Sequence, residues 1–531
     1  MKKEFLWWRD GVIYQIYPRS FADSDDDGIG DLRGITDHMD YLVDLGIDAI
    51  WLSPINPSPD VDFGYDVSDY QGIDPKFGTM RDFNRLVNAA ERAGIRIVMD
   101  LVLNHTSDQH PWFQSARSSK NDPFRDWYIW REVERNGKLP NNWQSVFGGS
   151  GWEWDADTDQ YYYHMFYKQQ PDLNWRNPKV RRELLDVFRF WLDKGVKGFR
   201  LDVFNMYFKD VHFRSNPVKL IGRRPFERQT HTYDCDRPEL FGVLADIRQV
   251  LDKYDETYVI GETFLGTPEK AASYCGSDFL HACFDFQFLE SKRSPTAVLK
   301  TVKKWESALG VTNWPNYVLN NHDTPRCASR FGLGENDERL KVVAAMLLTL
   351  RGTPFLYYGE EIGMRDICLK RGEILDPIGK KYWPIYKGRD GCRAPMQWNT
   401  DTNAGFSPVK PWLPVHPDFH QRNVETQSRD NQSLLQFYKQ LISFRRAQPE
   451  LISGDFQSLD VNSPHVLAYT RVHADQAILV LLNFAGKQKE ITLPDEGTYL
   501  IGLSSTGREP GKVGGSSLDL CANEVLILIK D

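Results

Sequence analysis

The stretch VKGFRLDV (Val196 to Val203) decides how this chain is expected to fold. It is a short apolar run that ends in a carboxylate, Asp202, and a valine. The runs Thr257 to Glu262 and Asn316 to Asp323 also end in a carboxylate. Because parallel strands deliver their carboxyl ends to one rim of a sheet, we expect these three acids to lie close together.

Further strand-like runs flank these three on both sides. They are Val12 to Pro18, Ala49 to Pro54, Arg96 to Leu103 and Thr353 to Tyr358, with a weaker one near Phe284 to Phe286. Helix-like stretches such as Met80 to Ala93 and Val180 to Lys194 lie between them. This alternation predicts an α/β fold with a parallel sheet, closed as a (β/α)8 TIM barrel, in which the chemistry sits at the carboxyl ends of the strands.

Two long intervals and a change of pattern predict the domain organisation. The interval from Leu103 to Val196 is too long for one βα unit. We therefore predict an excursion domain at 104–174, after the third strand and over the active site, and a catalytic barrel at 1–103 and 175–450. The interval from Gly359 to about Leu435 should also cover the catalytic face. Short alternating runs predict a C-terminal antiparallel β-sandwich at 451–531. These runs are Val466 to Val472, Ala477 to Phe484, Glu490 to Pro494, Thr498 to Leu503 and Glu524 to Ile529.

Composition limits the partners. A net charge of -8 and a pI near 5.9 argue against nucleic acid, which needs a basic face. The 16 Trp and 23 Tyr suit stacking on sugar rings, although many such rings belong to the core. We expect a small neutral oligosaccharide as the substrate, and a monomer or weak homodimer.

The same sequence favours a cytoplasmic location. The start, MKKEFLWWRDGV, falls short of a secretory signal. No run reaches the roughly 18 to 20 apolar residues of a membrane span, so no membrane association is expected, and Val342 to Leu350 reads as a buried helix. Seven cysteines without metal-type spacing predict free thiols in a reducing compartment.

Carboxylates gathered at one rim suit the cleavage of a glycosidic bond. In its transition state the sugar ring carries positive charge and the departing oxygen needs a proton, and two carboxyl groups can meet both needs. An ionised one attacks the anomeric carbon, and one with a raised pKa donates a proton and later activates water. A third can hold ring hydroxyls. The candidates are Asp202, Glu262 and Asp323.

Five segments in order resemble the signature regions of the α-amylase family, glycoside hydrolase family 13. They are DLVLNH (Asp100 to His105), QPDLNW (Gln170 to Trp175), GFRLD (Gly198 to Asp202), GET (Gly261 to Thr263) and NNHD (Asn320 to Asp323). WWRDGVIYQIYPRSF (Trp7 to Phe21) and GTPFLYYGEEIGM (Gly352 to Met364) are similar to the α-glucosidase and oligo-1,6-glucosidase branch. The resemblance implies the same three-part layout.

The resemblance also implies roles. Asp202 would be the nucleophile, Glu262 the acid/base and Asp323 the transition-state stabiliser of a retaining reaction, with the first two carboxyls about 5 to 5.5 Å apart. Arg200 would keep the nucleophile ionised. The residues expected around the bound glucose are Asp62, Tyr65, His105, His322 and Arg393. Taken alone, His105 could be structural and Arg393 could pair with a surface acid, but their motifs favour binding.

Linkage preference depends on Val203. In relatives a valine after the nucleophile accompanies α-1,6 activity and an alanine or threonine α-1,4 activity, although a β-branched residue also suits a strand. The insert RRPFERQTHTYDCDRP (Arg223 to Pro238) resembles another α-glucosidase subgroup and leaves the α-1,4 alternative open. We expect an exo-α-glucosidase that acts on short oligosaccharides such as isomaltose.

Other uses of the same fold remain as alternatives. A transglucosylase or a sucrose-acting enzyme would share the covalent intermediate. The segment DTPRCASRF after His322 lacks the arginine-rich loop of sucrose isomerases. Related folds that serve as transporter subunits carry a membrane anchor, which is not visible here, and need not keep the three acids.

The acidic loop DSDDDGIGD (Asp23 to Asp31) predicts a cation site. Its candidate ligands are the carboxylates of Asp23, Asp25, Asp27 and Asp31 and the backbone carbonyl of Ile29. Such spacing wraps oxygens around a hard cation, but position twelve is Gly34 instead of the glutamate of an EF-hand. We therefore expect one structural Ca²⁺ or Mg²⁺ and no organic cofactor, with a solvated acidic loop as the alternative.

Overall fold

The computed structural model describes residues 5–133, 138–222, 224–263, 266–292, 294–331, 336–493 and 497–531. Eight parallel strands form one sheet in the order β10-β11-β1-β2-β3-β7-β8-β9. They are β1 (Ile13–Ile16), β2 (Ala49–Leu52), β3 (Arg96–Leu101), β7 (Gly198–Leu201), β8 (Tyr258–Gly261), β9 (Ala282–Cys283), β10 (Asn316–Val318) and β11 (Thr353–Tyr357). The predicted parallel barrel is confirmed.

The barrel is nearly closed. Among the described residues no backbone pairing joins the end strands β9 and β10. The side chain of Asn316 spans this seam by donating a hydrogen bond to the carbonyl of Cys283 at 2.6 Å. The weak strand expected near Phe284 to Phe286 lies slightly earlier in the chain, because β9 ends at Cys283. Helix α9 (Phe286–Glu290) occupies the end of the expected range and has Asp285 as its N-cap.

Helices follow the barrel strands as the pattern predicted. Helix α4 (Met80–Arg92) begins with a capping box between Thr79 and Asp82, and α6 (Pro178–Asp193) has Asn177 as its N-cap. The other helices between the barrel strands are α2 (Leu32–Asp37), α3 (Met39–Leu45), α7 (Leu240–Leu251), α8 (Pro268–Ser273), α10 (Pro295–Leu309), α11 (Cys327–Arg330) and α12 (Asp337–Thr349).

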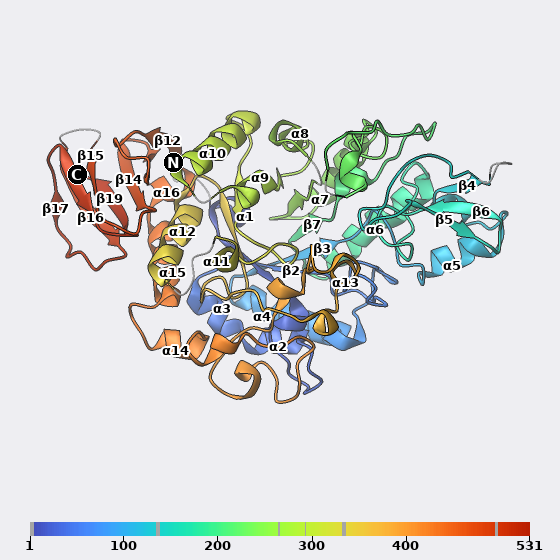
Figure 1. Cartoon of the computed structure of the whole chain (residues 1–531), viewed down its shortest axis with the longest axis horizontal. Helices are drawn as coiled ribbons and strands as arrows, with labels where there is room; N and C mark the ends of the chain where they lie inside the picture. The colour runs from blue at the N-terminus through green and yellow to red at the C-terminus, as the bar shows by residue number, and fades with distance from the viewer. Residues whose placement is uncertain are drawn as a thin grey trace.

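The chain between β3 and α6 builds a separate small sheet, on the right in Figure 1. It contains α5 (Pro111–Ser118) and three antiparallel strands in the order β4-β6-β5, namely β4 (Trp130–Glu132), β5 (Trp152–Asp155) and β6 (Gln160–Tyr163). Some of its apolar side chains, such as Trp152 and Tyr163, pack in one cluster with Val203 and Met206, which follow β7, and others, such as Phe113 and Tyr162, join the main core. The limits 104–174 stay a prediction.

The C-terminal part is antiparallel, as expected. One sheet has the order β12-β13-β14-β19-β16-β17, and β15 pairs with β18. The bounds are β12 (Asp455–Leu459), β13 (Val466–His473), β14 (Gln476–Asn483), β15 (Lys489–Thr492), β16 (Tyr499–Ser504), β17 (Lys512–Val513), β18 (Ser517–Leu520) and β19 (Val525–Lys530). The sequence patterns missed β12, β17 and β18, and the predicted end of one run at Pro494 lies outside the described residues.

Helix α12 joins the barrel to this C-terminal sheet. Every residue from Leu340 to Thr349 is buried, and the helix lies beside α15 (Leu434–Ala447), β14 and β19 (Figure 1). The Thr349 side chain bonds the Tyr469 hydroxyl, and Arg471 donates to the Thr349 carbonyl at 2.7 Å. The buried helix expected at Val342 to Leu350 is confirmed.

Two general features follow from the coordinates. Within the described ranges no helix combines the length and the apolar character that crossing a lipid bilayer requires. All seven cysteines are free thiols, five of them buried.

Candidate active site

The three predicted acids lie at the carboxyl ends of barrel strands. Asp202 directly follows β7, Glu262 directly follows β8, and Asp323 lies on the loop after β10. All three line one cavity of about 180 Å³. Four other predicted residues line it as well, namely Asp62, Tyr65, His105 and Val203. Sequence reasoning missed the rest of its wall, namely Val146, Phe147, Phe166, Arg224, Ile378, Tyr386 and Arg389.

The guanidinium of Arg200 brings the carboxyls of Asp202 and Glu262 together. Arg200 points from β7 and is 1% exposed. Its Nη1 donates to Asp202 Oδ1 at 2.7 Å and to Asp100 Oδ1 at 2.8 Å, and its Nη2 donates to Glu262. Since Nη1 and Nη2 belong to one planar group, the carboxyls of Asp202 and Glu262 are held side by side.

Three carboxyls therefore share one positive charge. Burial raises the pKa of Asp202 well above its usual range, although the Arg200 charge lowers it. Burial likewise raises the pKa of Asp100 to about 6. The two neighbouring carboxyls raise the pKa of Asp202 further, because they disfavour one more negative charge beside them. The Arg200 charge therefore favours the ionised form of Asp202, but burial outweighs it.

Asp323 is in a different electrostatic environment. Arg393 Nη2 donates to Asp323 Oδ1 at 2.7 Å, and Arg389 lies 3.6 Å from the same atom. Burial opposes ionisation, but nearby positive charge lowers the pKa of Asp323; since His322 is neutral at pH 7, that charge is mainly on the two arginines. Arg393 is fully buried and also donates to the His322 carbonyl at 2.7 Å. Arg393 therefore fixes the position of the Asp323 carboxylate.

Tyr65 forms the floor of the cavity on a hydrogen-bonded support. Its ring stacks on His322 with centroids 5.2 Å apart. Its hydroxyl donates to Asp100 Oδ2 at 3.0 Å and lies 2.6 Å from His322 Nε2, while Gln15 Nε2 lies 2.8 Å from His322 Nδ1. Burial lowers the pKa of His322 to about 3, so the ring is neutral. Both of its nitrogens are already bonded within the protein.

Asp62 is paired with an arginine that the sequence analysis passed over. Arg389 Nη2 donates to Asp62 Oδ1 at 2.7 Å and to Asp376 Oδ1 at 3.0 Å. Gln170 Nε2 donates to Asp62 Oδ2 and lies 3.1 Å from His105 Nε2. Burial raises the pKa of Asp62 and the Arg389 charge opposes it. The segment GRDGCRAPMQW holds two arginines, so the signal for Arg389 was present.

Val203 has an unusual backbone. Strand β7 ends at Leu201, and Val203 has φ 35° and ψ 40°, in the left-handed region. A β-branched residue there is strained by about 1 to 3 kcal/mol, which the surrounding packing must offset. Because Val203 lies beyond the strand, strand propensity does not account for the valine.

The acidic loop groups three of its predicted ligands. Carboxylate oxygens of Asp23, Asp25 and Asp27 lie within 4.8 Å of one another. Burial, with repulsion between the acids, raises the pKa of Asp25 and Asp27. Asp31 instead caps helix α2, accepting from Gly34 N at 2.7 Å.

The backbone around this cluster is constrained. Ile29 N donates to Asp27 Oδ1 at 2.7 Å. Gly28 has φ +91°, and a Cβ there would meet the Lys410 carbonyl at 2.4 Å, so only glycine fits. A tight turn that crowds carboxylate oxygens fits a hard cation, whose charge would relieve their repulsion.

Comparisons with known proteins match both the barrel and the C-terminal part of the chain. Residues 15–454 match the family model of the alpha amylase catalytic domain, and residues 466–527 match that of the alpha-amylase SusG C-terminal domain. The chain is 42% identical to a probable alpha-glucosidase of Rhizobium meliloti (strain 1021), covering 92% of this chain and 91% of the relative. It is 41% identical to an oligo-1,6-glucosidase of Parageobacillus thermoglucosidasius, covering 93% of each.

The fold of this chain is also similar to that of a solved structure. The alpha-glucosyl transfer enzyme XgtA superimposes with a TM-score of 0.94 at 38% identity, covering 99% of this chain and 100% of that one.

Proposed function

This chain belongs to the α-amylase family and is a glycoside hydrolase, and we propose that it is a retaining exo-α-glucosidase that releases glucose from the non-reducing ends of short oligosaccharides. The observation that carries the proposal is the pair Asp202 and Glu262, held by one guanidinium in one small cavity. The barrel at 1–103 and 175–450 supplies the acids, 104–174 covers them, and 451–531 is the C-terminal unit. The enzyme acts in the cytoplasm.

Two displacements at the anomeric carbon make up the reaction. Asp202 attacks while Glu262 gives its proton to the departing oxygen, and a covalent glucosyl ester forms. Glu262 then takes a proton from water, which attacks the ester and frees Asp202. Asp323, held ionised by Arg393, stabilises the positive ring and its hydroxyls.

The shape of the cavity supports exo action on short substrates. Its volume of about 180 Å³ is below the roughly 300 to 1,000 Å³ of pockets for drug-sized ligands. The buried ion pair between Asp62 and Arg389 lies in the wall of this cavity, and we expect it to block the passage of a longer chain. The terminal glucose would stack on Tyr65, near His105.

Linkage and acceptor are finer proposals. We place Val203 beside the leaving sugar and assign α-1,6 preference to the valine. The second candidate is α-1,4 hydrolysis or glucosyl transfer, favoured by the similarity to an alpha-glucosyl transfer enzyme and by Arg224 of the insert, which lines the cavity.

Product and rate measurements test the reaction class. Asp202→Asn and Glu262→Gln should abolish turnover with an unchanged circular dichroism spectrum, whereas Asp430→Asn on the surface should retain it. The glucose that water frees from the ester should appear first as the α-anomer by NMR. Release of β-glucose, or normal turnover in either active-site variant, would overturn the proposal. Hydrolysis rates on isomaltose, maltose and panose separate α-1,6 from α-1,4 activity. The products formed from concentrated maltose show whether glucosyl transfer occurs.

We also propose that the acidic loop holds one structural Ca²⁺ or Mg²⁺ through Asp23, Asp25, Asp27, Asp31 and the carbonyl of Ile29. The loop is tied to a distant segment, since Asp23 N donates to the Phe406 carbonyl and Trp412 N to the Gly28 carbonyl, both at 3.0 Å. A bound cation would therefore strengthen a long-range contact.

A further inference from the structure

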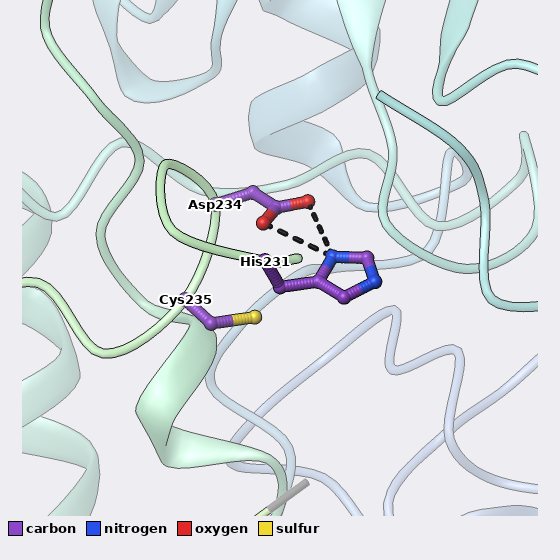
Figure 2. A group of neighbouring side chains, drawn as sticks. All are labelled: His231, Asp234 and Cys235. Atoms are coloured by element: carbon purple, nitrogen blue, oxygen red, sulfur yellow. Dashed lines mark hydrogen bonds and ion pairs between the residues drawn. The ribbon is translucent and has the colours of Figure 1, made fainter. Parts of the chain in front are cut away.

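The insert after β7 gathers three side chains that the proposed reaction does not use. Within the described part of this insert, 224–238, the ligand atoms of His231, Asp234 and Cys235 lie within 4.8 Å of one another. Figure 2 shows the Asp234 carboxylate above the His231 ring and the Cys235 sulfur below the stem of the same side chain. Asp234 and Cys235 are buried, and the His231 side chain is 6% exposed. The first residue of the insert, Arg223, lies outside the described residues.

The hydrogen bonds of His231 fix its tautomer. Its Nε2 lies 2.9 Å from the carbonyl of Phe226, which can only accept, so Nε2 carries a hydrogen. The Phe226 ring stacks on the imidazole with centroids 3.9 Å apart and holds its plane. In the neutral ring Nδ1 then presents a lone pair. This lone pair faces Asp234, whose two oxygens lie 3.0 and 3.1 Å away (Figure 2).

This arrangement places acceptors against one another. Asp234 is 0% exposed, and its carboxylate has no other hydrogen bond among the residues that the structure describes. A buried carboxylate normally needs several donors or a positive charge. The missing charge is either a proton on Nδ1 or a metal ion. The buried thiol of Cys235 lies beside the same atoms and favours the metal. A proton shared by His231 and Asp234 would not involve this thiol, whereas a metal ion would bind it.

The outer contacts match those of a metal site. A metal-binding histidine usually donates its other N–H to a carboxylate or backbone carbonyl, which fixes the ring, as Phe226 does here. Nitrogen, oxygen and sulfur ligands together suit a cation of intermediate softness such as Zn²⁺ and not Ca²⁺.

We propose that His231 Nδ1, the Asp234 carboxylate and the Cys235 thiolate bind one Zn²⁺-class cation. On binding, the thiol proton is released to solvent and the metal–sulfur bond forms, with no change of oxidation state. Three protein ligands leave one position of a tetrahedral Zn²⁺ for water. The same insert carries Arg224 into the wall of the catalytic cavity, where Arg224 donates to Glu227 Oε1 at 2.8 Å. The cation would therefore hold a segment of that wall. The proposal is independent of substrate.

Metal titration of the full chain tests the proposal. Chelator-treated, reduced protein is titrated with Zn²⁺ alone and, separately, with Co²⁺ alone. The wild type should bind Zn²⁺ in a site whose affinity Cys235→Ser lowers by at least about 10- to 100-fold, the loss typical of removing even an outer partner of a metal ligand. Co²⁺ should give a thiolate-to-metal charge-transfer band that the same variant lacks.

Matched controls separate this site from others. Cys368→Ser removes an exposed thiol and should retain both signals, and Asp25→Asn alters the acidic loop and should also retain them. Asp234→Asn, checked for folding by circular dichroism, should weaken Zn²⁺ as Cys235→Ser does. Equal Zn²⁺ affinity in the wild type and both variants, or Co²⁺ binding without the charge-transfer band, would overturn the proposal in favour of a protonated His231 paired with Asp234.

Discussion

Replacing Arg200 with lysine should disable the site while its positive charge stays in place. The guanidinium donates to Asp100, Asp202 and Glu262 from two nitrogens of one rigid plane. A lysine ammonium is a single point on a flexible stem, so it cannot span the same three carboxyls. The substitution therefore tests whether the geometry of the arginine, and not its charge alone, holds the two reacting acids in position.

The expected size of the effect follows from the contacts. An ammonium at this position keeps about one of the three charge-assisted hydrogen bonds of Arg200, and each lost bond is worth about 1.5 to 3 kcal/mol. Two lost bonds amount to about 3 to 6 kcal/mol. If that loss falls on the transition state, at about 1.36 kcal/mol per tenfold, kcat/KM should fall by about 10² to 10⁴.

The assay is kcat/KM on p-nitrophenyl α-glucoside, with thermal unfolding measured in parallel. Arg214→Lys is the matched control, because Arg214 also pairs with an aspartate, Asp210, but its side chain is 51% exposed. This control should stay within about twofold of the wild type, as expected for exposed ion pairs. Activity of Arg200→Lys within about tenfold of the wild type, with unchanged melting, would refute the reasoning.

Three further predictions concern other parts of the molecule. Burial raises the pKa of Glu360 to about 8 from 4.5. The native state then keeps a proton that the unfolded state releases, so stability falls by up to about 5 kcal/mol as pH rises from about 4.5 to 8. In denaturant titrations at pH 5 and 9, Glu360→Gln should lose less unfolding free energy between the two pH values than the wild type does. An equal loss in both proteins would contradict the role of Glu360. Val203→Thr should raise the maltose to isomaltose rate ratio by about tenfold, a typical effect of one small group in a pocket, and an unchanged ratio would rule out its role. Chelation should lower the melting temperature, and adding Ca²⁺ should restore it, since a ligand at 100 times its Kd stabilises by about 2.7 kcal/mol. Asp25→Asn should melt at the same temperature with and without Ca²⁺. If chelator leaves the melting temperature of the wild type unchanged, the proposed structural cation is refuted.

The barrel and the positions of its acids were predictable because the signal is local. Each acid follows a short apolar run, and strands β7 and β8 end one residue before Asp202 and Glu262. Parallel pairing then places both at the same rim. The strand β9 was misplaced because it has only two residues, too few to show a pattern, and because Asp285 starts a helix immediately after it.

The remaining wall of the site depends on contacts between distant segments. Arg389 reaches Asp62 from more than 300 positions along the chain, through a segment that has no periodic pattern. Phe147 and Tyr386 come from separate long connections as well. The raised pKa of Asp202 was also beyond the sequence, because it is set by how deeply Asp202 is buried and by the carboxyls that share Arg200 with it.

From Leu340 to Thr349, helix α12 is buried on all sides. This helix packs against the barrel on one side and against antiparallel strands on the other. Removing either part would expose to water the apolar surface that it covers on the helix. An enzyme shortened at Ser453 would expose the part of α12 that β14 and β19 now cover, at about 25 cal/mol for each Å² of apolar surface uncovered. The terminal sheet thus acts as the missing outer layer of the catalytic unit, and both should melt in a single transition.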